Sequence, residues 1–279
     1  MNGSRTGGSL AAELFDVRGD GALVTGAASG LGFAIARVLA ANGARVTLVD
    51  VDGERLGAAV EELSDAGGAV RGALADVSSR ESIESVIAAA AEWEGGLDTV
   101  FANAGVSSGL GHGLGVGGLA SVDDERWQRV LDVNLTGALH TIRAAAAALN
   151  DGGRIIATTS VAGLRADPLV GYAYSSSKAA LTHLVKVAAG ELAPRRIRVN
   201  AIAPGSFLTE IGRANPDSGR MLEELRRATL LGRLADPSEI EGLALLLGSG
   251  ASSHITGAVF TVDGGVMVQH GPVPGSGGS

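Results

Sequence analysis

The sequence predicts an α/β protein with a single domain, in which a doubly wound parallel sheet of about seven strands is covered by helices on both faces. Short apolar runs alternate with longer helical patterns at intervals of roughly two dozen residues. The apolar runs are continuous rather than alternating with polar residues, which is typical of parallel strands buried on both faces. The 279 residues contain no internal repeat and no convincing interior linker, so one domain is the simpler interpretation.

Each short apolar run is a predicted strand. In chain order the strands are Ala22–Thr25, Arg45–Val49, Ala69–Ala75, Thr99–Ala102, Arg154–Thr159, Ile197–Ile202 and Val259–Val262. The segments between them have helical patterns and predict helices at Leu31–Asn42, Gly53–Asp65, Ser79–Trp93, Asp123–Leu149, Tyr172–Leu192 and Pro237–Gly248. Right-handed crossovers through such helices bring the strands into one doubly wound sheet.

Two segments interrupt this rhythm. Ser107–Gly118 reads SSGLGHGLGVGG, a glycine-rich loop too long for a minimal connector. Ser206–Leu231 lies between a strand and a helix where a short turn would suffice. Because long loops at such positions are often lids or binding elements, we predict a lid at 206–231. The ends at 1–9 and 271–279 are rich in Gly, Ser and Pro and predict flexible tails around a domain at 10–270.

The composition excludes several classes of protein. The chain has no cysteine, which excludes disulfides, thiolate metal sites and cysteine nucleophiles. The net charge of −8 argues against nucleic acid or an anionic membrane as a partner, because no basic stripe is available to neutralise phosphates. The first residues lack a secretory pattern and no apolar run is long enough to span a membrane, so we expect a soluble, cytoplasmic protein. His140, His183 and His254 have no ligand-spaced partners, which predicts no metal site.

A glycine-rich turn follows the first strand and opens the first helix, in ALVTGAASGLGFAIARVLA. Gly26, Gly30 and Gly32 let the backbone approach a pyrophosphate, and the N-terminus of the following helix favours its charge. Ser29 and Leu31 belong to the same turn. The arrangement predicts a dinucleotide site of the Rossmann type, although such a turn can also be purely structural.

Asp50 indicates which dinucleotide is bound. It closes the second strand, RVTLVD, about where an acid is expected for the adenosine ribose. A carboxylate there accepts bonds from both ribose hydroxyls and repels a 2′-phosphate. Neither Ser29 nor Val51 is basic, so nothing obvious compensates an extra phosphate. We therefore predict NAD rather than NADP; the alternative role for Asp50 is that of an exposed acid at a strand end.

Two further strand ends fit a dinucleotide. Asp76 and Val77 end the third strand, where an adenine is expected to lie. Asn103, Ala104 and Gly105 follow the fourth strand; the asparagine can tie neighbouring strands together, and the small pair leaves room for the cofactor. Each position taken alone is as compatible with a role in the fold as with one in binding.

The order of these motifs resembles the short-chain dehydrogenase/reductase family and, given Asp50, its NAD-preferring subgroup. TGAASGLG at Thr25–Gly32 matches the family's TGxxxGxG, which differs from the GxGxxG of other dinucleotide folds. The other matches are NAG at Asn103–Gly105, Asn134, SVAG at Ser160–Gly163, YSSSK at Tyr174–Lys178, VNAIAPG at Val199–Gly205 and TGAVFTVDGG at Thr256–Gly265. They span roughly residues 20 to 267, almost the whole domain.

Tyr174 and Lys178 are the predicted catalytic pair. They are four residues apart on a predicted helix and therefore share a face. A phenol ionises near pH ~10, and a nearby ammonium lowers that pKa toward the range of a usable base. Tyr172 lies roughly 120° away from Lys178 around the helix and is expected to face elsewhere.

Ser160 follows the apolar strand IIATT, at the carboxyl end where ligands of open α/β sheets bind. Its hydroxyl is placed to donate to a substrate oxygen, and the resemblance selects it over Thr158 and Thr159. The interval from Gly163 to Tyr174 is one residue longer than the family pattern, which concerns the shape of that loop rather than the catalytic roles.

The resemblance implies the remaining roles. Hydride would pass between C4 of the nicotinamide and the carbinol carbon while Tyr174 exchanges the hydroxyl proton, and Lys178 would also bind the nicotinamide ribose. Asn134 would hold a water that connects Lys178 to solvent. The Pro204–Gly205 pair would line the nicotinamide, and Thr209 would reach its carboxamide. Family members usually assemble as tetramers through the helices that contain Asn134 and Tyr174, which implies a homotetramer.

The predicted substrate is a small molecule, a moderately hydrophobic secondary alcohol or its ketone. Apolar residues in the two long loops indicate this, namely Phe207, Leu208, Ile211, Met221, Leu222 and Leu225, with Leu110, Leu114 and Val116 opposite. Two alternatives remain open. One is an NADP-dependent 3-oxoacyl-carrier-protein reductase, against which Asp50 and the missing basic residue count. The other is a catalytically silent nucleotide sensor, a reading that usually requires a broken active site.

Overall fold

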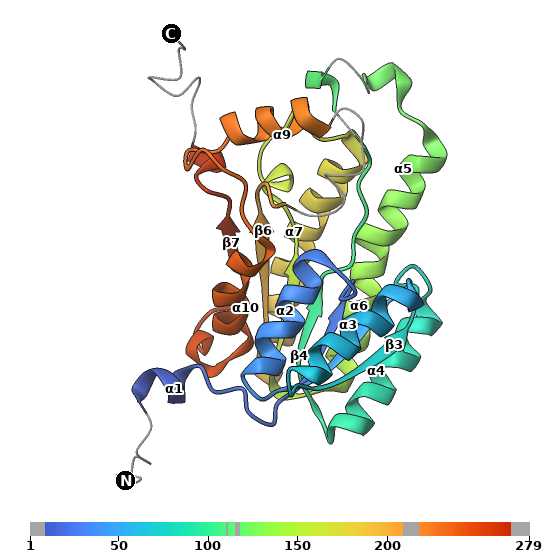
Figure 1. Ribbon diagram of the computed structural model, residues 1–279. Coiled ribbons are helices and arrows are strands. Elements are labelled where there is room, and N and C mark those ends of the chain that lie inside the picture. The colour runs from blue at the N-terminus through green and yellow to red at the C-terminus, as the bar shows by residue number, and fades with distance from the viewer. Residues whose placement is uncertain (1–8, 110, 115–117, 209–217, 269–279) are drawn as a thin grey trace.

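The computed structural model describes residues 9–109, 111–114, 118–208 and 218–268. Within these ranges the strands form one parallel sheet in the order β3-β2-β1-β4-β5-β6-β7 (Figure 1). The strands are β1 (Gly21–Thr25), β2 (Arg45–Asp50), β3 (Ala69–Leu74), β4 (Leu97–Ala102), β5 (Leu149–Thr158), β6 (Arg198–Pro204) and β7 (Val259–Val262). The prediction of a single-domain, doubly wound α/β fold with seven strands is confirmed.

Helices cover both faces of the sheet (Figure 1). One face packs against α2 (Gly30–Ala41), α3 (Gly53–Asp65) and α10 (Glu241–Gly248). The other packs against α4 (Arg80–Glu94), α6 (Ala138–Ala148) and α7 (Tyr172–Leu192). The remaining α-helices in the described ranges are α1 (Leu10–Leu14), α5 (Asp124–Leu131) and α9 (Ser218–Arg227). None of the helices in these ranges is long and apolar enough to cross a membrane.

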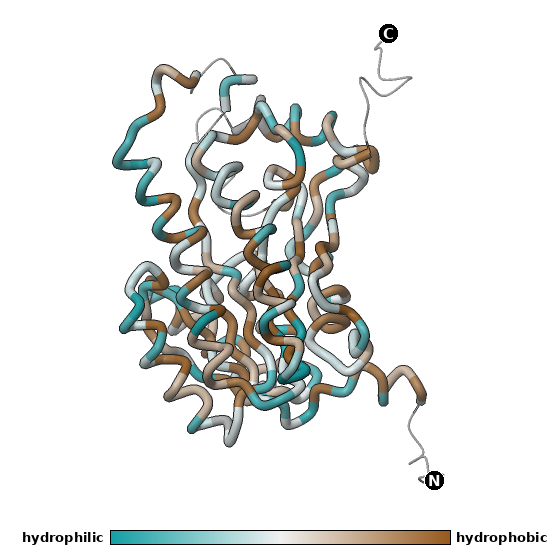
Figure 2. Tube along the Cα trace, turned by 180° about the vertical axis from the view of Figure 1, so that it is seen from behind, coloured by the Kyte–Doolittle hydropathy of each residue, from teal (hydrophilic) through white to brown (hydrophobic). Residues whose placement is uncertain are grey.

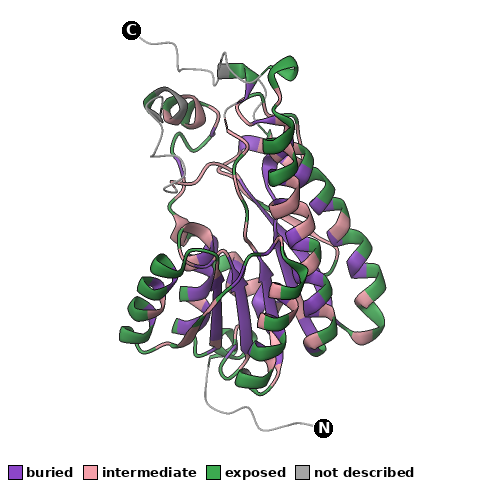
Figure 3. Ribbon diagram, turned by 90° about the vertical axis from the view of Figure 1, so that its right-hand side faces the viewer, coloured by how far each residue is buried: buried purple, intermediate pink, exposed green. Residues whose placement is uncertain are grey.

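The core lies in two layers because neighbouring residues of a strand point to opposite faces of the sheet. In β5, Ile155 packs into the layer with α4, α6 and α7, whereas Ile156 packs into the layer with α2 and α10. Leu23 and Val24 divide between the layers in the same way in β1. Both faces of the inner strands such as β1 and β2 are therefore buried (Figure 3), which is why these strands are continuous apolar runs in the sequence.

The strand order reverses between β1 and β4. β1 pairs with β2 on one side and with β4 on the other, so the chain crosses over here and the connections leave in opposite directions. In open α/β sheets a crevice forms at the carboxyl ends of the strands at such a point. The sheet topology thus places the candidate site above β1, β4 and β5.

Several predicted boundaries differ from the structure. β5 begins at Leu149 rather than Arg154, because Leu149 pairs with Leu97 and a register shift follows before Arg154 pairs with Thr99. Residues 150–153 are polar or glycine, so the sequence shows no apolar run there. The helix predicted at 123–149 is α5, a π-helical segment at Asp132–Gly137, and α6. The helix predicted at 237–248 begins with a 3₁₀ turn before α10.

The helix α1 was absent from the sequence prediction. Ser9 caps it with its side chain, yet the helix has only five residues and none of them is buried, which is too short a segment for a helical period to be recognised. Leu10 and Leu14 are exposed, and the hydrophobic segment is visible beside the N-terminus in Figure 2. Apart from Ser9, the predicted tails at 1–9 and 271–279 lie outside the described residues.

Candidate active site

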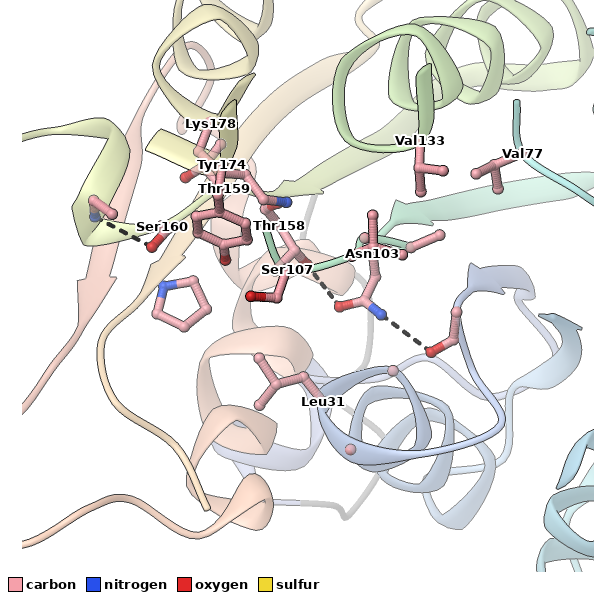
Figure 4. Close-up of a pocket in the computed structure, with 18 of the residues that line it drawn as sticks. Leu31, Val77, Asn103, Ser107, Val133, Thr158, Thr159, Ser160, Tyr174 and Lys178 are labelled. Carbon is pink, nitrogen blue, oxygen red and sulfur yellow. Dashed lines mark hydrogen bonds between the residues drawn. The ribbon is translucent and has the colours of Figure 1, made fainter. Parts of the chain in front are cut away.

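A cavity of about 1,610 Å³ opens at the carboxyl ends of the central strands (Figure 4). Its wall includes every described residue predicted to bind the cofactor: Gly26, Ser29, Gly30, Leu31, Gly32, Asp50, Val51, Asp76, Val77, Asn103, Ala104, Gly105, Tyr174, Lys178, Pro204 and Gly205. Ser160 lines the same cavity, whereas Asn134 is buried behind its wall. Thr209 lies outside the described residues.

The glycine-rich turn leaves space where side chains would be. Gly26 has a φ of +65°, and a Cβ on it would lie 2.8 Å from the Cα of Ala104. A Cβ on Gly32 would lie 2.0 Å from the Gly26 carbonyl oxygen. Ser29, the N-cap of α2, makes no side-chain capping bond within the described residues, so the first amides of α2 remain available to an anion. This cradle fits a pyrophosphate.

Asp50 is held at the edge of the cavity by backbone amides. Its Oδ2 accepts a hydrogen bond from Ala28 N at 3.0 Å, and its Oδ1 accepts from Val51 N at 2.8 Å and from Asp52 N at 3.1 Å. The carboxylate is therefore fixed between the glycine-rich turn and the start of α3, on the side of the cavity that a ribose would occupy.

Arg55 lines the same end of the cavity and was missed in the sequence analysis. It lies in the first turn of α3, and its Nε is 3.4 Å from Asp52 Oδ2. The available signal was its place three residues after the N-cap Asp52, in the first turn of the helix that follows β2.

Asn103 joins three strands through its side chain. Its Nδ2 donates to Thr25 O at 3.0 Å and to Gly26 O at 3.3 Å, and its Oδ1 accepts from Thr158 Oγ1 at 2.9 Å (Figure 4). The Thr25 hydroxyl accepts in turn from the backbone amides of Asn103 and Ala104. The expected tie between neighbouring strands is thus present, and it also fixes the floor of the cavity.

Tyr174 and Lys178 lie together on α7, as their spacing predicts. Lys178 is 2% exposed, and its Nζ lies 5.6 Å from the centroid of the Tyr174 ring. This amine donates to Thr158 O at 2.8 Å. Burial lowers the pKa of Lys178 to about 8.

The pKa of Tyr174 moves in the direction opposite to the one expected from the sequence. Burial raises the pKa of the phenol, and a hydrogen bond with Ser160 opposes that shift only in part. The expectation considered only the attraction of the Lys178 ammonium for a phenolate. Loss of solvation around the phenol is the larger effect.

Ser160 is the only one of three consecutive hydroxyl residues that bonds to the Tyr174 phenol. Its Oγ also accepts from Ala162 N at 3.2 Å. Thr158 donates to Asn103, and Thr159 donates to Ile202 O at 3.0 Å. The hydroxyls of Thr158 and Thr159 therefore connect neighbouring strands, and Ser160 is the residue beside the phenol (Figure 4).

Asn134 lies in the π-helical segment and is fully buried. Its Oδ1 accepts from Val106 N at 2.7 Å, and its Nδ2 donates to Val106 O at 2.9 Å and to Ser177 Oγ at 3.3 Å. The side chain clamps the segment after β4 onto α7. A π-segment disrupts the regular carbonyl ladder of the helix and is frequent at functional sites.

Tyr172 faces away from the catalytic pair, as expected. Its ring stacks on His112 with a centroid distance of 6.0 Å and an interplanar angle of 21°. His112 belongs to the glycine-rich loop at 107–118 and is exposed. Neither ring lines the cavity.

The predicted lid contributes two apolar side chains that the structure describes in the cavity wall, Phe207 and Leu225. Leu169 and Val170 add apolar surface from the loop between β5 and α7, which the sequence analysis did not assign to the substrate. Leu110, Val116 and Ile211 lie outside the described residues, and nothing is described for the side chains of Leu114 and Met221. Among the described residues no group of three or more histidine or acidic side chains is placed to hold a metal ion.

Comparisons with known proteins agree with this geometry. The family model for "Enoyl-(Acyl carrier protein) reductase" matches residues 26–267. Galactitol 2-dehydrogenase (L-tagatose-forming) of Cereibacter sphaeroides is 36% identical, over 91% of this chain and 98% of that protein. The 3-alpha-(or 20-beta)-hydroxysteroid dehydrogenase of Mycobacterium tuberculosis is 37% identical, over 88% of each chain.

Solved structures give the same result. A short-chain type dehydrogenase/reductase from Mycobacterium marinum superposes with a TM-score of 0.84 at 35% identity, over 92% of this chain and 99% of the other. Levodione reductase superposes with a TM-score of 0.84 at 28% identity, over 91% and 99% of the two chains. The chain therefore belongs to the short-chain dehydrogenase/reductase family of oxidoreductases.

Proposed function

We propose that this protein transfers a hydride between NAD(H) and a secondary alcohol or its ketone, with Tyr174 as the acid–base residue. One observation supports this most strongly: the Tyr174 phenol, the Ser160 hydroxyl and the Lys178 amine converge in one cavity that extends to the glycine-rich turn. A silent nucleotide sensor would need none of these three groups in such an arrangement.

The residues present fit a nicotinamide dinucleotide. The glycine-rich turn and the open amides of α2 would hold the pyrophosphate, Asp50 the adenosine ribose, and Asp76 and Val77 the adenine. The Pro204–Gly205 pair would lie against the nicotinamide. When bound, the nicotinamide supplies the hydride chemistry.

The protein's own groups would orient the substrate and move one proton. Ser160 would donate a hydrogen bond to the substrate oxygen. Tyr174 would give its proton to that oxygen during ketone reduction and take it back during alcohol oxidation. Lys178 would hold the nicotinamide ribose and keep a positive charge near the phenol, and Asn134 would hold a water that leads from Lys178 to solvent.

The choice of NAD rests on Asp50. A 2′-phosphate would face its carboxylate, which backbone amides hold in place. Arg55 is the one observation that favours the second candidate, an NADP-dependent 3-oxoacyl-carrier-protein reductase, because it lies at the same end of the cavity. Its proximity to Asp52 reduces the charge it would offer to a phosphate.

A moderately hydrophobic substrate fits the apolar side chains of the cavity wall. These include Val161, Leu169, Val170, Phe207 and Leu225. The names of two similar proteins point the same way, since one is a hydroxysteroid dehydrogenase and the other a levodione reductase. Galactitol 2-dehydrogenase is a relative named for a polyol, so the test also includes polyols as substrates.

The test is the change in nicotinamide absorbance across a panel of secondary alcohols, polyols, ketones and 3-oxoacyl thioesters, with NAD and NADP forms supplied separately. We expect turnover of apolar alcohols with NAD, and a loss of at least about a hundredfold in Tyr174→Phe, because positioned acid–base catalysis contributes on that order. Turnover that survives Tyr174→Phe would refute the mechanism. A clear preference for NADP with the thioesters would establish the second candidate instead.

A further inference from the structure

The catalytic tyrosine lies in the first turn of α7, and this turn lacks a cap of its own. The helix begins at Tyr172 with Gly171 as its N-cap, and within the described residues Gly171 provides no side-chain capping bond. Tyr174 is the third residue of the helix, so its amide is one of the donors that the helix itself leaves without a partner. An uncapped first turn frays readily.

The loop after β4 supplies this cap from a distant part of the chain. Ser108 Oγ accepts a hydrogen bond from Tyr174 N at 3.3 Å, across 66 residues of sequence. The next residue, Gly109, accepts from Gly171 N through its carbonyl oxygen, also at 3.3 Å. Two of the orphan amides at the start of α7 therefore find their partners in one short segment of the loop.

The absence of a side chain at Gly171 makes room for this contact. A Cβ on Gly171 would lie 2.4 Å from Ser108 Oγ. The backbone of Gly171 is extended, with φ −69° and ψ 155°, which is the conformation in which a serine would cap the helix directly. The chain therefore uses glycine at the N-cap and receives the hydroxyl from Ser108.

Further backbone contacts hold the loop in place. Gly111 N donates to Leu169 O at 3.0 Å, and Gly113 N donates to Pro168 O at 2.8 Å. A Cβ on Gly111 would lie 2.3 Å from Pro168 O, so the close approach depends on glycine there. These backbone hydrogen bonds join the loop after β4 to the loop before α7, and we call this contact the seam. Ser107 and Gly109 of the first loop lie in the cavity wall.

We propose that Ser108 is a positioning residue for Tyr174, which it holds by capping the first turn of α7 from the substrate-side loop. This inference rests on the proposed role of Tyr174 as the acid–base residue. Ser107 and Gly109 line the cavity on either side of Ser108. A substrate that contacts this loop therefore also affects the position of the Tyr174 phenol.

The test moves the capping hydroxyl from residue 108 to the N-cap of α7 at residue 171. Ser108→Ala removes the distant cap, and Ser108→Ala combined with Gly171→Ser restores one at the N-cap itself. The added Cβ then meets Ser108 Cβ and O at 3.2 and 3.3 Å, which a shift of a few tenths of an ångström relieves. Gly171→Ser alone meets the Ser108 hydroxyl and is expected to be worse than the double variant. Ser121→Ala, in the same connection between β4 and α5 but outside the cavity wall, is the matched control.

Two readouts are measured for each variant. Hydrogen exchange of the peptide that contains residues 172–177 reports the first turn of α7, and steady-state kinetics reports catalysis. We expect Ser108→Ala to speed this exchange and to lower kcat about three- to tenfold, the effect of losing one cap, with NADH affinity unchanged. The double variant should recover both quantities to within about twofold.

Each contrary result has one meaning. Unchanged exchange in Ser108→Ala would show that the cap does not hold the turn. Faster exchange with unchanged kcat, or a kcat that the double variant does not recover, would overturn the positioning role. An inactive wild-type enzyme would overturn the proposed function instead, and the exchange data would distinguish that failure from the others.

Discussion

At the scale of single residues, a chain of hydrogen bonds connects the glycine-rich turn to Lys178. It runs from the Thr25 and Gly26 carbonyls to Asn103, from Asn103 to the Thr158 hydroxyl, and from the Thr158 carbonyl to Lys178. Every link joins a different strand or helix. Lys178 is therefore positioned by the same groups that shape the glycine-rich turn.

The pKa directions at this site give a prediction for pH dependence. Ketone reduction needs a protonated Tyr174, which its raised pKa secures, and a charged Lys178, whose pKa is about 8. We expect kcat/KM for reduction to be level at low pH and to fall as the pH rises through about 8. Alcohol oxidation needs the phenolate, so its rate should instead rise into the alkaline range.

Profiles of kcat/KM in both directions between about pH 5 and 10 check this prediction. Lys186→Arg, an exposed position on the same helix, is the control that should leave both profiles unchanged. A reduction rate that increases between pH 7 and 9 would contradict the assignment of these two groups.

At the scale of elements, the junction between β1 and α2 is the part of the fold least able to accept a larger side chain. Gly32 lies in the first turn of α2, where a Cβ would meet both the Gly26 carbonyl and the Asn103 amide, the latter at 2.6 Å. The Gly26 carbonyl is backbone, and hydrogen bonds to Thr25, Gly26 and Thr158 hold the Asn103 side chain in place, so the helix must move away from the strand.

Gly32→Ala should therefore abolish measurable NADH binding and lower the free energy of unfolding by about 1–3 kcal/mol. Fluorescence titration with NADH and urea denaturation measure the two effects. The matched control is Gly57→Ala in α3, where a Cβ meets nothing within 4 Å; it should bind NADH normally and be as stable as the wild type or more so. Normal NADH affinity in Gly32→Ala would contradict the proposed phosphate cradle.

Some parts of the candidate site could be predicted from the sequence and others could not. The glycine-rich turn, Asp50 and the pair Tyr174 and Lys178 were predictable, because a local period or a strand end fixes each of them. Ser108 was not, because its partner lies 66 residues away and only the folded loops bring them together. The pKa direction of Tyr174 was not predictable either, since it depends on burial rather than on the neighbouring charge.

At the scale of the whole molecule, the packing of the alanine-rich end of α6 limits the expected subunit contacts. Ala144 and Ala145 are already buried within the chain, in the core layer that includes α4. The large apolar side chains still exposed on α6 and α7 are Leu139 and Val187, at 40% and 57%. They are the side chains that a partner subunit would cover.

We therefore expect a homotetramer, with a mass by light scattering of four times the chain mass of 27.8 kDa. Leu139→Glu combined with Val187→Glu should lower that mass, because burying two carboxylates in an interface is unfavourable. Leu14→Glu on α1 changes an equally exposed leucine and should leave the mass unchanged. A wild-type chain that scatters as a monomer would rule out this assembly.

The strand order also sets the sequence in which the site can be assembled. β1 pairs with β2, which in turn pairs with β3, so the hydrogen-bonded pairings among the first three strands involve no later part of the chain. During synthesis these pairings can form before β4 arrives. The first turn of α7 needs both loops of the seam, and contacts between residues so far apart in the chain are slow to form. We expect a folding intermediate in which β1, β2 and β3 are paired while the first turn of α7 is not yet ordered.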